Sequence, residues 1–129
     1  MGMYTELYLE CKIDVSKMSD IEKDIITYMF DKSEEITPTI LPGGELFKCY
    51  RWDMIGRGHS AYFQDDVDSK LIKENNIWYI VNRCDFKNYD NEIQLFLKWV
   101  KPYIVKNSDK QCIGYHRGED FYEKTDIYV

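Results

Sequence analysis

The sequence of 129 residues has little of what builds metal sites, disulfide scaffolds or membrane spans. Its four cysteines, Cys11, Cys49, Cys84 and Cys112, are widely spaced and include no C-x-x-C pair, which disfavours a zinc site or a disulfide framework. The longest apolar runs, such as 78–81, are far shorter than the roughly 20 residues of a membrane span. No segment with the pattern of a secretory signal begins the chain. We therefore expect four free thiols, a cytoplasmic location, and no metal or cofactor.

Aromatic side chains and acidic charge are what the sequence has in excess. Aromatic residues make up 16% of the chain, and 17 Lys and Arg against 23 Asp and Glu give a net charge of −6. A hydrophobic content of 44% is enough for a packed core. The negative charge opposes direct binding to a nucleic acid, and we expect no membrane binding. We expect one domain over residues 1–129, with residues 1–2 as a remnant of cloning.

The spacing of apolar residues predicts an α+β fold. Clean alternation over the first strand is typical of a half-buried antiparallel strand, and a capping box at Ser19 and Glu22 starts the first helix. Pro102 should kink or end the second helix. The predicted strands cover 4–13, 60–64, 77–86, 111–117 and 126–129, and the predicted helices cover 19–31 and 89–104.

This β-α-β-β-α-β order with an additional last strand fits a ferredoxin-like split β-α-β arrangement, an antiparallel sheet with two helices on one face. The apolar stripes of the two helices should be buried against that sheet. They comprise Ile21, Ile25, Met29, Ile93, Phe96, Leu97 and Val100. The other face of the sheet would then be polar and rich in tyrosine. Ferredoxin-like sheets often bind partners through this face, although such a transfer is analogy only.

Two segments outside these elements are candidates for a binding surface. Residues 32–58 form a long irregular connection that contains Tyr50, Arg51 and Trp52, and long connections within a compact domain are often functional. Exposed Tyr, Trp and Arg are typical of interface hot spots, although these rings could equally fill the core. An acidic connection further along lacks the glycine and glutamate of a calcium loop and should be a solvated turn. It contains Asp65, Asp66 and Asp68.

The densest group of reactive side chains lies near the end of the chain, at Tyr115, His116, Arg117, Glu119 and Asp120. A strand would place Tyr115 and Arg117 on one face and His116 on the other, so the three would not converge unaided. Two interpretations stay open: a solvated strand end, or the site of a nucleotide-signal binder or a metal-independent nuclease. Because no phosphate loop, nucleophile elbow or zinc-protease helix is present, we expect a protein that is not an enzyme.

Several scattered matches mark a resemblance to known sequences. They are the run K-N-Y-D-N-E-I at 87–93, the pair Arg51-Trp52, and G-Y-x-R-x-E-D at 114–120. On these residues the chain resembles a family of small uncharacterised bacteriophage and prophage proteins, from whose pattern it departs at His116. The resemblance implies a phage setting but no activity and no site residues.

In that setting, we expect a phage-encoded accessory protein that binds and inhibits a host protein, such as a defence system or another nucleic-acid enzyme. Its carboxylates would occupy a basic groove where phosphates otherwise bind. A homodimer stays open. The candidate binding residues are Tyr50, Arg51, Trp52, Asp65, Asp66, Asp68, Tyr115, Arg117, Glu119 and Asp120.

Overall fold

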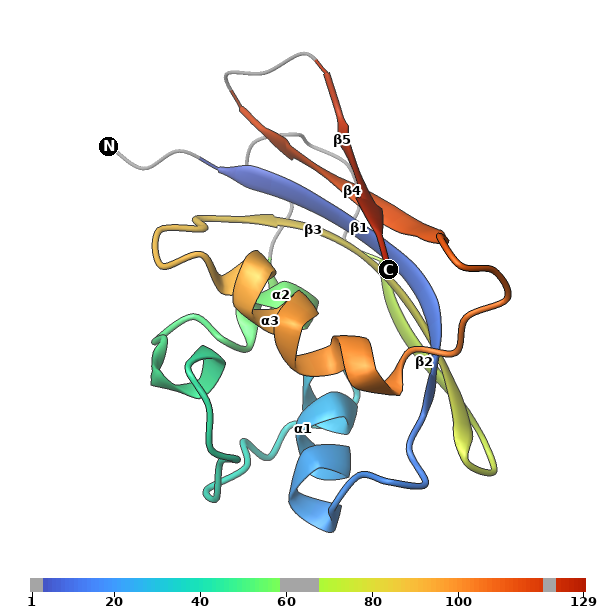
Figure 1. Ribbon diagram of the computed structural model, residues 1–129. Coiled ribbons are helices and arrows are strands. Elements are labelled where there is room, and N and C mark those ends of the chain that lie inside the picture. The colour runs from blue at the N-terminus through green and yellow to red at the C-terminus, as the bar shows by residue number, and fades with distance from the viewer. Residues whose placement is uncertain (1–3, 59–67, 120–122) are drawn as a thin grey trace.

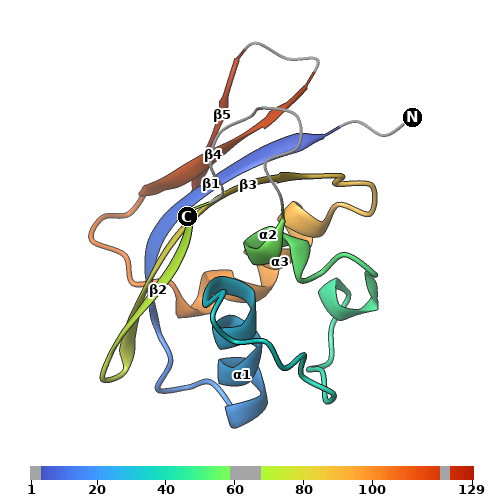
Figure 2. The same cartoon turned by 180° about the vertical axis from the view of Figure 1, so that it is seen from behind.

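The computed structural model describes residues 4–58, 68–119 and 123–129 as a sheet with helices packed against one of its faces (Figures 1 and 2). The strands are β1 (Thr5–Asp14), β2 (Asp68–Glu74), β3 (Ile77–Phe86), β4 (Cys112–Gly118) and β5 (Thr125–Tyr128). The helices are α1 (Asp20–Phe30), α2 (Met54–Arg57) and α3 (Glu92–Val100), with short 3-10 helices at Leu46–Lys48 and Lys101–Tyr103. None of the described helices combines the length and the apolar character needed to cross a membrane.

The sheet is antiparallel throughout, with the strand order β2-β3-β1-β4-β5. The central strand β1 pairs with β3 along its whole length, from Thr5 opposite Phe86 to Asp14 opposite Ile77. Its pairing with β4 is shorter and ends at Leu9, opposite Gly114. The predicted α+β class with an antiparallel sheet is confirmed.

The capping box predicted for the first helix is present. The Ser19 hydroxyl accepts from the backbone N–H of Glu22 at 3.2 Å, and the Glu22 carboxylate accepts from the backbone N–H of Ser19 at 3.0 Å. At the other end of α1, Arg57 donates from Nε to the carbonyl oxygen of Tyr28 at 2.5 Å and from Nη2 to that of Asp31 at 3.2 Å. The segment 32–58, expected to be irregular, therefore contains a short helix, α2, that holds the C-terminus of α1 in place.

The core confirms most of the predicted buried residues and corrects two of them. Ile25 and Met29 of α1 are buried, and so are the members of the α3 stripe other than Leu97. Ile21 is 38% exposed, because it lies in the first turn of α1, at the end of the helix that is farthest from the sheet (Figure 1). Leu97 is only partly buried on the flank of α3. The second helix is shorter than expected, with a 3-10 turn at Pro102 and Asn88 accepting from the backbone N–H of Ile93 at 3.1 Å.

The edge strand β2 was not predicted. The strand expected at 60–64 lies outside the described residues, whereas the structure forms a hairpin of β2 and β3 in which Asp68 is opposite Arg83. Asp68 therefore begins a strand instead of lying within an acidic turn. The sequence of β2 shows no alternation of apolar and polar residues, since its two apolar residues are adjacent. Leu71 packs against the core, and Ile72 is exposed.

Candidate functional site

The aromatic segment at 50–52 is divided between surface and core. Tyr50 is 90% exposed, and the Arg51 guanidinium lies 5.2 Å from the centre of the Tyr89 ring. Trp52 is only 8% exposed, and its ring lies 6.1 Å from that of Tyr28 and 5.6 Å from that of Phe47. The expectation that Trp52 belongs to an exposed hot spot is therefore wrong, because its indole fills the core beneath α1.

An earlier stretch of the chain places acidic and aliphatic side chains on the surface, and a cavity brings some of them together. Residues 17–45 contain seven acidic residues and three lysines, so this stretch has a charge of −4 out of the total of −6. We call its surface-facing part the acidic surface, defined by Asp20, Ile21, Asp24, Glu34, Glu35, Ile36, Ile40 and Leu41. Ile36 is the most exposed of its apolar members, at 79%. A cavity of about 250 Å³ is lined by Asp24, Glu34 and Ile36 of this surface, together with Thr27, Tyr28 and Pro38.

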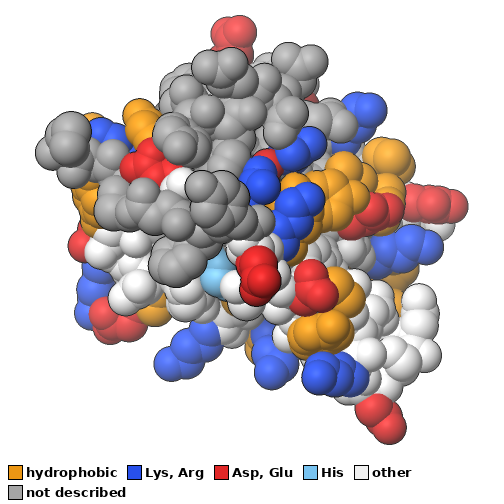
Figure 3. All heavy atoms as spheres, turned by 90° about the horizontal axis from the view of Figure 1, so that it is seen from above, with side chains coloured by type: hydrophobic (Ala, Val, Ile, Leu, Met, Phe, Trp, Pro, Cys, Tyr) orange, Lys and Arg blue, Asp and Glu red, His pale blue; other side chains and the backbone are white. Residues whose placement is uncertain are grey.

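Seen from above, the described surface carries both signs of charge mixed with hydrophobic side chains (Figure 3). On the face of the sheet away from the helices, near the start of β1, the carboxylate of Glu6 is buried, with 1% of the residue exposed. Arg83 donates to Oε2 of Glu6 from Nη2 at 2.8 Å and from Nε at 3.2 Å, and Nη2 of Arg117 lies 2.9 Å from Oε1. The guanidinium of Arg117 is therefore engaged by Glu6.

The predicted division of the cluster at 115–117 is confirmed. Tyr115 lies opposite Tyr8 and Arg117 opposite Glu6 on the open face, whereas His116 lies opposite Leu7 on the face that bears the helices. Burial lowers the pKa of His116, which favours a neutral imidazole.

A cavity of about 380 Å³ is lined by His116 and Arg117 but not by Tyr115. Glu119 follows this strand, and its backbone N–H donates to the carbonyl oxygen of Tyr4 at 2.9 Å. Asp65, Asp66 and Asp120 lie outside the described residues, and for Asp68 only the backbone is described. The structure does not bring Tyr50 and Arg51 together with Tyr115 and Arg117, because the first pair lies on the helix side of the sheet and the second on the open face.

A group of three side chains on the open face was not identified from the sequence. The Tyr8 hydroxyl donates to Oε2 of Glu10 at 2.5 Å, and the Tyr79 hydroxyl donates to Oε1 of the same carboxylate. The hydrogen bond to Glu10, with a smaller contribution from burial, raises the pKa of Tyr8 to about 12. The pKa of Tyr79 is raised by the same kind of hydrogen bond, and the two phenols lower the pKa of Glu10. The arrangement therefore holds one negative charge between two protonated phenols at neutral pH.

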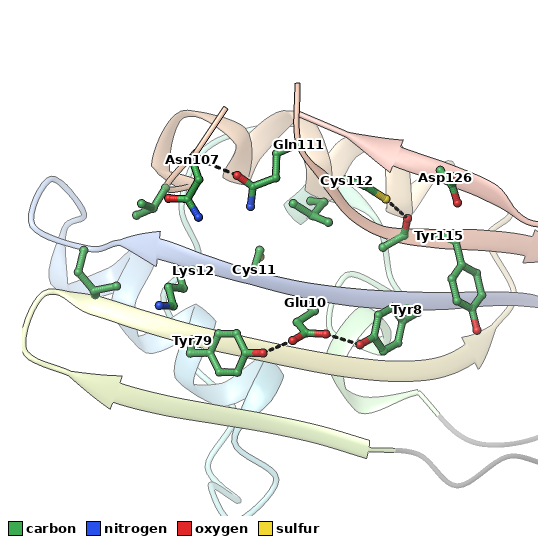
Figure 4. Close-up of a pocket in the computed structure, with 14 residues that line it drawn as sticks. Tyr8, Glu10, Cys11, Lys12, Tyr79, Asn107, Gln111, Cys112, Tyr115 and Asp126 are labelled. Atoms are coloured by element: carbon green, nitrogen blue, oxygen red, sulfur yellow. Dashed lines mark hydrogen bonds between the residues drawn. The ribbon is translucent and has the colours of Figure 1, made fainter. Parts of the chain in front are cut away.

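These three residues line a groove of about 760 Å³ where β1 and β4 separate (Figure 4). Tyr115 stacks on Tyr8 at one wall, with 5.6 Å between the ring centres and 18° between the ring planes. Asp126 on β5 and Lys12 on β1 also line the groove. Alternation places Tyr8 and Glu10 on the polar face of their strand, but the part played by Tyr79 depends on the register between β1 and β3.

Comparisons with known proteins give no family for the chain. The scan against protein-family models, the search of curated proteins and the search of solved structures find no match. The function of the chain must therefore be inferred from its own residues and their arrangement.

Proposed function

We propose that the chain is a non-catalytic protein that binds a basic surface of another protein through its acidic surface and thereby inhibits it. The observation that carries the proposal is the coincidence of a −4 charge over residues 17–45 with exposed aliphatic side chains such as Ile36. Carboxylates would repel a nucleic acid or an anionic membrane, whereas they attract lysine and arginine. Exposed isoleucine adds an apolar contact that a purely solvated acidic surface would not need.

The resemblance to small bacteriophage and prophage proteins supports a host cell as the setting of this interaction, with a cytoplasmic location. Nucleic-acid enzymes, including those of defence systems, present basic grooves that bind phosphates. A protein whose carboxylates take the place of phosphates would compete for such a groove and would associate rapidly at low salt. A homodimer is compatible with this proposal.

We also propose that the fold is a ferredoxin-like split β-α-β arrangement with an added edge strand. The strand order β2-β3-β1-β4 supports it, since β3 lies between β1 and β2 and β4 lies beside β1. The helix α1 lies in the chain between β1 and β2, and α3 lies between β3 and β4. Strand β5 then extends the sheet beyond β4.

The proposal is tested by affinity capture from a host lysate with two matched variants. One variant combines Asp24→Asn, Glu34→Gln and Glu35→Gln in the acidic surface. The control combines Glu74→Gln, Asp90→Asn and Asp109→Asn, three exposed positions outside the acidic surface and the groove, which changes the net charge by the same amount. We expect the wild type and the control to capture a basic protein whose recovery falls between about 0.05 M and about 0.5 M salt, as screening requires.

The acidic-surface variant should lose this partner and should also lose inhibition of its activity. Ile36→Ser should weaken the same interaction without changing the charge. Equal capture by both triple variants, or capture that does not depend on salt, would contradict a role for the acidic surface.

A nucleotide-signal binder or nuclease is the second candidate, and the cavity at His116 and Arg117 favours it. We rank it lower because Arg117 already pairs with Glu6 and because Tyr115 does not line that cavity. A nucleotide released on denaturation of the purified protein, together with loss of that nucleotide from His116→Ala, would favour this candidate over the first.

A further inference from the structure

The groove on the open face exists because β1 and β4 stop pairing partway along the sheet. Their pairing ends at Leu9 and Gly114, and β4 is irregular between Cys112 and Gly114. Beyond that point, the next backbone hydrogen bond on this side of β1 is at Lys12, whose carbonyl oxygen accepts from the backbone N–H of Val105 at 2.9 Å. The resulting volume of about 760 Å³ lies within the roughly 300–1,000 Å³ that small-molecule sites occupy.

The hydrogen bonds among Tyr8, Glu10 and Tyr79 leave these three side chains with free acceptor positions and no free hydroxyl donor. Tyr8 and Tyr79 each have one hydroxyl proton, and both protons are donated to Glu10. Each phenol oxygen can therefore only accept further hydrogen bonds, and the carboxylate keeps about two of its roughly four acceptor positions. A group rich in donors and positive in charge is the complement of this arrangement.

A second carboxylate and an aromatic ring face of the groove favour the same kind of ligand. Asp126 supplies a second carboxylate, and Lys12 is the one basic side chain among the described residues that line the groove. Aromatic ring faces attract cations, and the chain already uses this attraction on Tyr115: the Lys124 ammonium lies 4.3 Å from the centre of that ring.

We propose that the groove binds a small aliphatic amine, with its ammonium group held by the carboxylate of Glu10 and by the phenol oxygens of Tyr8 and Tyr79. An ammonium group has three donors, which matches the acceptors of Tyr8, Glu10 and Tyr79. A calcium ion would need six or more oxygen ligands, and the described residues contain no group of three or more His, Cys, Asp and Glu side chains placed to hold a metal. This site is separate from the acidic surface and does not depend on the function proposed above.

The test is a calorimetric titration of the protein with 1,4-diaminobutane at low salt and neutral pH. We expect one binding site, and we expect Glu10→Gln to weaken the affinity by about tenfold or more, since a charged hydrogen-bond partner is lost. Tyr79→Phe keeps the ring but removes one oxygen and should weaken the affinity by about two- to fivefold. The matched control Asp90→Asn, which removes one exposed negative charge outside the groove and outside the acidic surface, should keep the wild-type affinity.

Circular dichroism of each variant establishes that it is folded. We expect Glu10→Gln to fold like the wild type, because the Glu10 side chain is exposed. Absence of heat with the wild type in repeated titrations, or equal affinity of wild type and Glu10→Gln, would overturn the proposal. Binding of inorganic phosphate in place of the diamine would overturn it as well. A lysine-containing peptide that binds at least tenfold more tightly than the diamine would replace the free amine with a lysine side chain of a partner.

Discussion

Two glutamates of β1 lie four residues apart on the same face of the sheet and are held in opposite ways. Glu6 is buried and is held by the guanidinium groups of Arg83 and Arg117. Glu10 is exposed and is held by the hydroxyls of two neutral phenols. Burial of a charged carboxylate is costly unless hydrogen bonds and opposite charge replace its water, and for Glu6 the two arginines supply both. The phenols orient an exposed carboxylate without neutralising it.

The difference assigns the two ends of this face to different tasks. At the Glu6 end, β1 is paired with a strand on each side, and the charges of the carboxylate and the arginines are used within the protein. At the Glu10 end, the pairing with β4 has ended, and the negative charge faces the groove. The first end stabilises the sheet, and the second is suited to a ligand.

The largest expected effect comes from removing the buried charge. Glu6→Gln leaves two arginines without their carboxylate, and we expect it to lower the free energy of unfolding by about 3 kcal/mol, the low end for a broken buried ion pair because both arginines are partly exposed. Glu10→Gln should cost less than about 1 kcal/mol, as is usual at exposed positions. Urea denaturation of both variants measures the difference, and equal losses would show that the two glutamates are held alike.

A smaller effect is expected where β4 leaves β1. Gly114 has φ of +154°, and a Cβ added there would lie 1.8 Å from the carbonyl oxygen of Tyr8. Gly114→Ala should therefore cost about 1–3 kcal/mol of strain and should loosen the pairing that closes one end of the groove. The control Gly43→Ala should change stability little, since no described atom lies within 4 Å of its added Cβ. Thermal unfolding of both variants measures these effects. A Gly114→Ala protein as stable as the wild type would contradict the tight contact at Tyr8.

The sequence predicts the parts of this fold that depend on local patterns. Alternation of apolar residues identifies β1, and the reciprocal hydrogen bonds of Ser19 and Glu22 locate the start of α1, because each involves neighbours in the chain. The edge strand β2 could not be predicted, since its stability comes from backbone pairing with β3 and its sequence buries few side chains.

The candidate site depends even more on long-range register. Tyr79 and Glu10 are 69 residues apart in the chain and meet only because β3 and β1 pair in one particular alignment. The role of Arg57 as a cap for α1 is likewise a contact between distant segments. Composition did indicate an excess of tyrosine on the polar face of β1, but not which of these residues share a carboxylate.

The smallest expected effect on stability comes from the titration of Tyr8, whose hydroxyl is hydrogen-bonded to Glu10. The hydrogen bond to Glu10 raises the pKa of Tyr8 to about 12, from an ordinary value of 10.0, so the folded protein holds this proton more tightly than the unfolded chain does. The stabilisation is therefore complete below about pH 10 and is lost as the pH rises towards about 12.

Ultraviolet titration of the phenols should show a late-titrating group that is absent from Tyr8→Phe. In Glu10→Gln the same group should titrate closer to 10, because the charge that holds the proton is gone. A variant such as Lys70→Gln on the edge strand serves as a control for general changes in charge. If the late group persists in Glu10→Gln, then Glu10 does not hold the phenol proton, and the acceptor-rich character of the groove is lost with it.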